Sequence, residues 1–87
     1  MKLYMIIKKI VDEPITLELK NGIIIHGVLQ NVDKCLNIFL TNVKRSVNNT
    51  NSIFLKGIAI RGNNIRYIIL PNWLNLDSLL YEFNEKY

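Results

Sequence analysis

The protein has 87 residues, of which 49% are hydrophobic and 21% are charged, and its mean hydropathy is +0.15. This size and composition predict one small folded domain, because disordered chains combine low hydrophobicity with high net charge. The net charge is +4, but residues 1–71 hold ten basic residues against four acidic ones and carry +6, whereas residues 72–87 carry −2. A basic body of this kind suits a polyanionic partner such as nucleic acid, but a small excess of positive charge is also common in proteins that bind none, so the charge alone does not decide.

Several classes of protein are excluded by what the sequence lacks. No apolar run approaches the roughly 20 residues that a membrane-spanning helix needs, so no membrane partner is expected. Lysines interrupt the apolar N-terminus, which argues against a secretion signal and predicts an intracellular protein. With one cysteine, Cys35, and one histidine, His26, neither an internal disulfide nor a four-ligand zinc site can form, and no cofactor is expected.

The N-terminus predicts a short helix that leads into a strand. Apolar residues at positions 3, 6, 7 and 10 have the spacing of one helix face, which predicts an amphipathic helix over residues 2–11. Pro14 ends helical structure, and strict alternation of apolar and polar residues predicts a strand over residues 15–20.

Four more strands are predicted after the first, over residues 23–32, 38–44, 53–60 and 65–70. They are separated by a turn at Asn21-Gly22, which is typical of a type I′ hairpin, and by loops at residues 33–37, 46–52 and 61–64. Gly27 and Gly57 lie inside strands and indicate sharp bends or close backbone approaches.

The C-terminus predicts a second short helix. Pro71 ends the last strand, and Asn75 and Asp77 are possible N-caps. The apolar residues behind these caps have near-helical spacing, at Leu76, Leu79, Leu80 and Phe83.

These elements together predict an all-β domain with short helices, spanning residues 1–87. One helix followed by five short strands with interior glycines indicates a strongly bent, five-stranded antiparallel barrel of the SH3-like type, only partly closed. The strands at 53–60 and 65–70 show little protection of their edges, so another subunit is expected to cover them. The residues predicted at this subunit interface are Ile65, Tyr67, Ile68 and Ile69.

No constellation of residues points to catalysis, so the chain is not expected to be an enzyme or to bind a small-molecule substrate. His26 has no nucleophile signature near it and is interpreted as an ordinary strand position, and the scattered carboxylates predict no metal site. The loops Asp33–Asn37 and Arg61–Asn64 are chemically richer. Asn and Arg can read and stack on single-stranded bases, but the same residues are common in turns, and composition alone favours the turn interpretation.

Two stretches change that balance, because they resemble the paired motifs of the Sm and Sm-like proteins. The first motif covers about residues 14–45 and contains LELKNG, HG and VD with Asn37 four residues after Asp33. The second covers about residues 53–70 and contains IRGNNIRY before an Ile-Leu-Pro ending. The resemblance leaves residues 72–87 as a C-terminal extension. Some spliceosomal members carry an Arg-Gly-rich tail that this sequence lacks, so the functions of such a tail are not carried over.

The resemblance implies the Sm fold, assembled edge to edge into a seven-membered ring that binds a uridine-rich single strand in its centre. It also implies roles in an RNA site for Cys35, Asn37, Arg61, Gly62 and Asn63. Asn37 would read the uracil edge and Arg61 would stack on the base or flank it, while Asn63 and the Gly62 backbone would complete the pocket. Many members have a stacking residue at position 35, where this chain has the small Cys35. Asp33 would orient Asn37.

Three functions follow in order of preference. The first is a non-catalytic Sm core subunit of spliceosomal small nuclear ribonucleoproteins, which binds the uridine-rich site of small nuclear RNA in pre-mRNA splicing. Such a protein is expected in the nucleus and, during assembly, in the cytoplasm. The second is a subunit of an Sm-like ring that binds oligouridine 3′ ends of RNA in splicing or decay. The third is an SH3-like adaptor for peptides, although the aromatic residues show no cluster in sequence.

Overall fold

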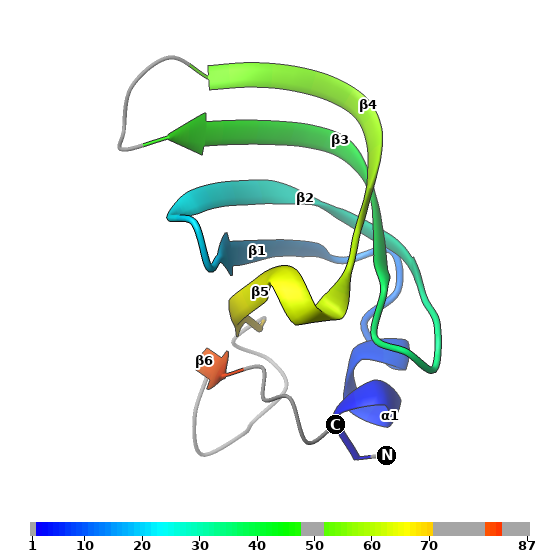
Figure 1. Ribbon diagram of the computed structural model, residues 1–87. Helices are drawn as coiled ribbons and strands as arrows, with labels where there is room; N and C mark the ends of the chain where they lie inside the picture. The colour runs from blue at the N-terminus through cyan, green and yellow to red at the C-terminus, as the bar shows by residue number, and fades with distance from the viewer. Residues whose placement is uncertain (1, 48–51, 71–79, 83–87) are drawn as a thin grey trace.

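A computed structural model of the protein describes residues 2–47, 52–70 and 80–82 (Figure 1). A short N-terminal helix is followed by strands and one turn of 3₁₀ helix, in the order α1 (Lys2–Lys8), β1 (Pro14–Leu19), β2 (Ile23–Val32), β3 (Ile38–Val47), β4 (Ser52–Ile60), η1 (Gly62–Asn64), β5 (Ile65–Ile69) and β6 (Leu80–Glu82).

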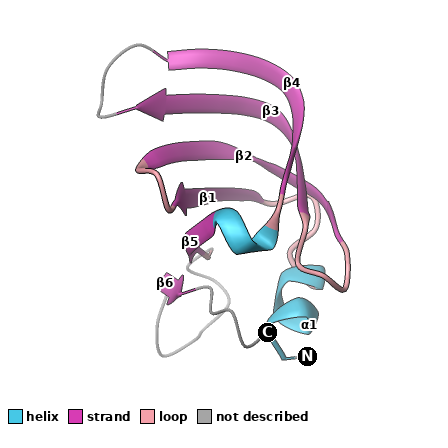
Figure 2. Ribbon diagram, in the orientation of Figure 1, coloured by secondary structure: helices cyan, strands magenta, loops and turns pink. Residues whose placement is uncertain are grey.

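The strands form one antiparallel sheet in the order β4-β3-β2-β1-β5-β6. Figure 1 shows that the sheet curls strongly, so that the end of β4 crosses toward β5, and that α1 lies below one end of the curl. Figure 2 shows the loop between β2 and β3 reaching down beside α1. The predicted fold of one helix and five bent antiparallel strands is confirmed, and β6 is an additional strand.

The inside of the curl is apolar because the strands alternate buried and exposed positions. In β1, Ile15 and Leu17 are buried while their neighbours are more exposed, which is the period-2 pattern of a sheet with one covered face. The buried face of α1 closes one end of this core through Leu3 and Ile7. The buried side chains of the described residues are all hydrophobic.

Two positions on neighbouring strands produce the sharp bend. At Gly27 an added Cβ would lie 3.1 Å from the carbonyl oxygen of Thr41, so the backbones of β2 and β3 approach closely there, as the sequence predicted. The pairing shifts at this point, because His26 pairs with Lys44 but Val28 pairs with Thr41. Asn42 and Val43 of β3 therefore lie opposite the single residue Gly27 of β2, and Asn42 has a left-handed φ of +52°. This is a β-bulge, which raises the local twist and bends the sheet.

Two local predictions in the N-terminal third are corrected. The helix ends at Lys8 rather than at residue 11, because Lys9 and Ile10 already donate to carbonyls three residues back and Asp12 has a φ of +76°. The turn at Asn21-Gly22 is not type I′, since that type needs positive φ at both residues and only Gly22 has it, at +89°. Instead the Gly22 N–H donates to the Leu19 carbonyl, at 3.0 Å.

The C-terminal prediction is wrong where the structure describes it. Leu80, which was expected in a helix, belongs to β6, and β6 pairs with β5 so that Ile69 lies opposite Leu80 and Tyr67 opposite Glu82. The rest of the predicted helix, including Leu76, Leu79 and Phe83, lies outside the described residues. The expected open edge of β5 is therefore covered by the chain itself.

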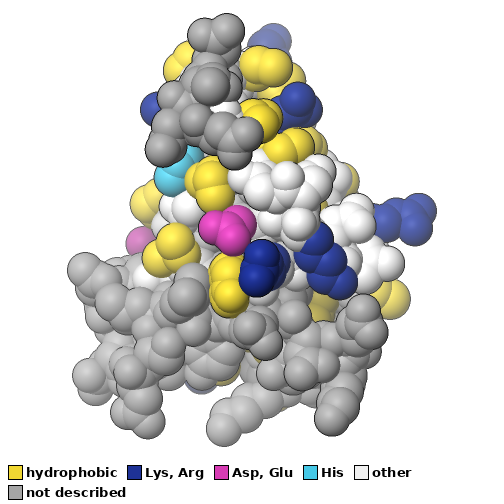
Figure 3. All heavy atoms as spheres, turned by 60° about the vertical axis from the view of Figure 1, so that its left-hand side comes forward, with side chains coloured by type: hydrophobic (Ala, Val, Ile, Leu, Met, Phe, Trp, Pro, Cys, Tyr) yellow, Lys and Arg dark blue, Asp and Glu magenta, His cyan; other side chains and the backbone are white. Residues whose placement is uncertain are grey.

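The predicted interface residues on β5 divide into two groups. Ile65 and Ile68 are fully buried in the core, so their side chains are not available to a partner. Tyr67 is half-buried and Ile69 is 45% exposed. On β4, which is the other end of the sheet, Ile53 and Phe54 are 48% and 75% exposed. Figure 3 shows hydrophobic side chains exposed beside lysine and arginine on one face of the molecule.

Candidate nucleic-acid interface

The loop between β2 and β3 is organised by one carboxylate, that of Asp33. Its Oδ1 accepts the backbone N–H groups of Cys35 and Asn37, both at 2.9 Å. Its Oδ2 accepts from Nδ2 of the Asn37 side chain, also at 2.9 Å. The expectation that Asp33 orients Asn37 therefore has a geometric basis. Because the amide nitrogen faces the carboxylate, the second amide N–H and the amide oxygen of Asn37 are left to meet a ligand.

Leu36 fixes the same loop from the inside. Its side chain is buried in the core and its backbone has a φ of +63°, a left-handed conformation that is uncommon for a residue of this size. Its N–H donates to the Asp33 carbonyl at 3.0 Å, and the Asp33 N–H donates to the Asn37 carbonyl at 3.1 Å. These contacts close a tight loop that projects Cys35 outward, where it is exposed.

The second loop, between β4 and β5, packs directly on the first. Gly62 is buried, and a Cβ added to it would lie 2.6 Å from the carbonyl oxygen of Leu36. A residue with a side chain would therefore push the two loops apart. The Asn64 N–H donates to the Arg61 carbonyl at 3.0 Å, and the Lys20 N–H donates to the Asn64 carbonyl at 2.9 Å, so the second loop is also tied to the β1–β2 hairpin.

The two loops line an open hollow of about 350 Å³. Its lining is made of the five residues to which the family resemblance assigned roles in an RNA site, namely Cys35, Asn37, Arg61, Gly62 and Asn63. The volume falls within the roughly 300–1,000 Å³ of small-ligand pockets, so a nucleobase can enter. The hollow is mostly polar and offers an amide, a guanidinium and a second amide, which suits a base edge better than an apolar ligand.

The hydrogen bonds around Asp33 also set its ionisation. Those from the backbone and side chain of Asn37, with a smaller one from the Cys35 backbone, lower the pKa of the Asp33 carboxyl below its ordinary value. The carboxylate is therefore charged at physiological pH and can act only as an acceptor toward the Asn37 amide. The exposed and positively charged Arg61 also lines the hollow.

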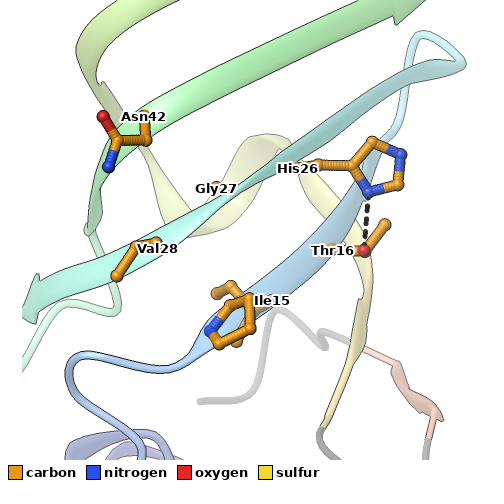
Figure 4. A pocket seen from close by; sticks show the side chains of 7 residues that line it. Ile15, Thr16, His26, Gly27, Val28 and Asn42 are labelled. Atoms are coloured by element: carbon orange, nitrogen blue, oxygen red, sulfur yellow. Dashed lines mark hydrogen bonds between the residues drawn. The ribbon is translucent and has the colours of Figure 1, made fainter.

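A second hollow lies on the outer side of β1 and β2, lined by Pro14, Ile15, Thr16, His26, Gly27, Val28 and Asn42 (Figure 4). Here the Thr16 hydroxyl and His26 Nδ1 form a hydrogen bond of 2.8 Å across paired strand positions. His26 is exposed and its ring has a partner in a neighbouring strand, which agrees with an ordinary strand position. Among the residues that the structure describes, no three His, Cys, Asp or Glu side chains gather as a metal site would require.

The sequence found the side chains that face the hollow but missed what holds them. The sequence did not identify Leu36 as part of this framework, because a leucine between polar loop residues does not indicate a buried side chain on a left-handed backbone. Gly62 was assigned to the pocket for its backbone, whereas the structure shows it as the contact that allows the two loops to meet.

The model of the family described as the LSM domain matches residues 5–70, which is most of the chain. Among curated proteins, the small nuclear ribonucleoprotein Sm D1 of Saccharomyces cerevisiae is 40% identical, over 94% of this chain and 75% of that protein. The probable U6 snRNA-associated Sm-like protein LSm2 of Dictyostelium discoideum is 44% identical, over 74% of this chain and 56% of that protein. The chain thus spans little more than half the length of the second relative.

Solved structures give the same fold. The Sm protein of Pyrococcus abyssii, determined in complex with a uridine heptamer, superposes with a TM-score of 0.68 and is 26% identical in sequence. The superposition covers 74% of this chain and 90% of the Pyrococcus chain. A heptameric archaeal Sm protein superposes with a TM-score of 0.66 at 19% identity, over 74% of this chain and 93% of its own, and supports the fold. No helix among the described residues has the length and apolar character needed to cross a membrane. The chain belongs to the LSM family of Sm and Sm-like proteins, whose members are non-catalytic, RNA-binding ring subunits.

Proposed function

We propose that this protein is an Sm core subunit of spliceosomal small nuclear ribonucleoproteins and binds the uridine-rich site of small nuclear RNA within a seven-membered ring. Residues 1–87 form one Sm domain, with the C-terminal extension beginning at residue 72. The observation that carries the proposal is the Asp33–Asn37 pair in the wall of a nucleobase-sized hollow. The protein is expected in the nucleus and, while particles assemble, in the cytoplasm.

The geometry favours uracil over cytosine because Asp33 holds the Asn37 amide in one orientation. If the amide turned over, its oxygen would face the carboxylate at about the same distance, and two acceptors would repel. In the held orientation, the amide oxygen accepts and the remaining N–H donates. Uracil presents an N3–H donor beside a carbonyl acceptor, which matches this pattern. Cytosine in the same position presents an unprotonated N3 to the amide oxygen and an amino group to the amide N–H, so neither hydrogen bond forms.

The other lining residues complete the base site. Arg61 supplies a guanidinium plane that stacks on or flanks the base and a positive charge that attracts the RNA backbone. Asn63 and the Gly62 backbone add polar contacts at the edge of the hollow. Cys35 is small, so it contacts the base without offering an aromatic stacking surface, and most stacking in this subunit comes from the Arg61 side.

The comparison with the yeast Sm D1 protein supports the spliceosomal assignment, because the match extends over 94% of this chain. The LSm2 relatives favour a second candidate, an Sm-like ring subunit that binds oligouridine 3′ ends, since one of them reaches 44% identity. That match covers 74% of this chain, so it supports the second candidate less strongly than the Sm D1 match supports the first.

RNA that co-purifies with the protein distinguishes the two candidates. The full chain carrying an affinity tag is purified from its native cell, and the bound RNA is sequenced. Small nuclear RNAs with an internal uridine-rich site support the spliceosomal assignment, whereas oligouridine 3′ ends support the Sm-like one. An Asn37→Ala, Arg61→Ala variant purified in parallel is the control, and RNA that depends on the pocket is depleted from it. RNA of no preferred sequence, equal in both samples, would overturn the proposal.

A further inference from the structure

We propose that β6 occupies the edge of β5 with which the β4 strand of a neighbouring subunit would pair in the ring, so that the chain covers its own assembly surface. We call β6 in this role the guard. Ring entry then requires β6 to leave β5. The inference rests on the proposed ring assembly and adds to it a competition within the chain.

The two ends of the sheet are unequal. β4 ends the sheet on one side, and none of the described residues pairs with its outer edge. On the other side β5 would be the end, but its outer edge is paired with β6. Strand edges that lack a partner invite pairing with another chain, and head-to-tail pairing between two different edges of identical or related subunits closes into a ring. β6 therefore blocks one of the two surfaces that such a ring needs.

β4 is a better match for the β5 edge than β6 is. β6 has three residues and pairs with Tyr67, Ile68 and Ile69 only. β4 has nine residues, enough to pair with all five of β5, and it exposes the apolar side chains of Ile53 and Phe54. Burying these apolar surfaces, together with that of the 45% exposed Ile69, favours the intermolecular strand over the shorter intramolecular one.

The incomplete cover also provides a place for the exchange to begin. Ile65 and Arg66 belong to β5 but have no partner in β6. They follow η1 directly, and Gly62 and Asn63 of η1 line the hollow between the two loops. An incoming strand can pair first at Ile65 and Arg66 and then displace β6 one residue at a time toward Ile69. The guard therefore slows or weakens assembly without preventing it.

The pairing itself is tested by disulfide trapping in the full chain. Residues opposite each other in an antiparallel pair have Cα atoms about 4.5–5.5 Å apart, which a disulfide can bridge. Tyr67→Cys with Glu82→Cys joins two such residues. Ile69→Cys with Glu82→Cys is the matched control, offset by two positions. Under a glutathione buffer the first pair should cross-link in most molecules and the second much less. Equal trapping of both pairs would show that β6 is not seated on β5.

The effect on assembly is measured with the same variant. The subunits that co-purify with the wild-type chain are produced together without it, and the variant is added in oxidised or reduced form, with ring formation followed by native mass spectrometry. If β6 must leave, the oxidised chain enters rings at least about tenfold less than the same chain after reduction. The full chain with Leu80→Pro and Glu82→Pro should enter at lower concentration than wild type, and Asn84→Pro is its control.

The outcomes separate the two proposals. Equal ring entry by the oxidised and reduced chain overturns the guard while leaving the ring assignment intact, because β4 would then be pairing elsewhere. Proline variants that enter rings no better than wild type count against the guard in the same way. A chain that forms no ring in any state overturns the ring assignment, and the guard falls with it.

Discussion

Replacing Asn37 with alanine should remove the preference for uridine. In the structure one amide N–H of Asn37 is bound to Asp33, so two groups remain for the base, the second N–H and the oxygen. A hydrogen bond contributes about 0.5–1.5 kcal/mol net, so two of them contribute about 1–3 kcal/mol. Asn37→Ala should therefore weaken binding of a uridine-rich strand by about 5- to 150-fold. Binding of a cytidine strand should change much less, because the held amide does not match cytosine.

The assay is a fluorescence anisotropy titration of assembled rings with uridine and cytidine strands at two salt concentrations. Lys44→Ala is the matched control, since Lys44 is exposed on β3 and does not line the hollow, and its loss should change affinity for the two strands equally. Arg61→Ala tests the shared pocket. Its loss and that of Asn37 should be non-additive, because both side chains act on one nucleotide. A variant Asn37→Ala that keeps the uridine preference in normally formed rings would show that Asn37 only satisfies its turn.

Three further changes probe the same loops. Asp33→Asn should reduce discrimination between uridine and cytidine more than it reduces total affinity, as seen in the same titrations, because the Asn37 amide is no longer held in one orientation. The pKa of Asp33 is lowered in the folded protein, so its stabilisation of the loop is present above the ordinary value of 3.8 and is lost as the pH falls through the lowered value. The Asn37 side-chain NMR signals should therefore shift in that acidic window and stay constant above it. Gly62→Ala should cost about 1–3 kcal/mol of stability in urea unfolding, because its Cβ would meet the Leu36 carbonyl, and no loss would mean that the loops separate freely.

Most of the fold could be predicted because its signals are local. The alternation that begins at Ile15 and the helical spacing that begins at Leu3 each report which face of an element is buried, and the core confirms both. The bulge at Asn42 could not be predicted, because it depends on how β2 and β3 pair across the bend. The prediction of a C-terminal helix failed for a related reason. Its apolar spacing fits a helix, but its state around Leu80 is decided by pairing with β5, which is distant in sequence.

The candidate site was predictable in its side chains and not in its framework. The resemblance to the Sm motifs assigned Asp33 and Asn37 to one site, and the structure has their side chains in contact at 2.9 Å. The approach of Gly62 to Leu36 joins two loops that are 26 positions apart in the chain, and no local pattern reports it. Sequence therefore indicated which groups could contact a base, whereas the meeting of the two loops depends on the closure of the whole sheet.

Photochemical cross-linking tests most directly whether the hollow between the two loops binds uridine. Rings that contain the full chain are irradiated with a uridine-rich strand, and the cross-linked peptides are identified by mass spectrometry. Cross-linked uridine should map to residues 33–37 and 61–63, and the cross-links should be lost when Asn37 and Arg61 are replaced by alanine in rings that still form. Cross-links that map elsewhere on the chain, or that persist unchanged in this variant, would contradict the assignment.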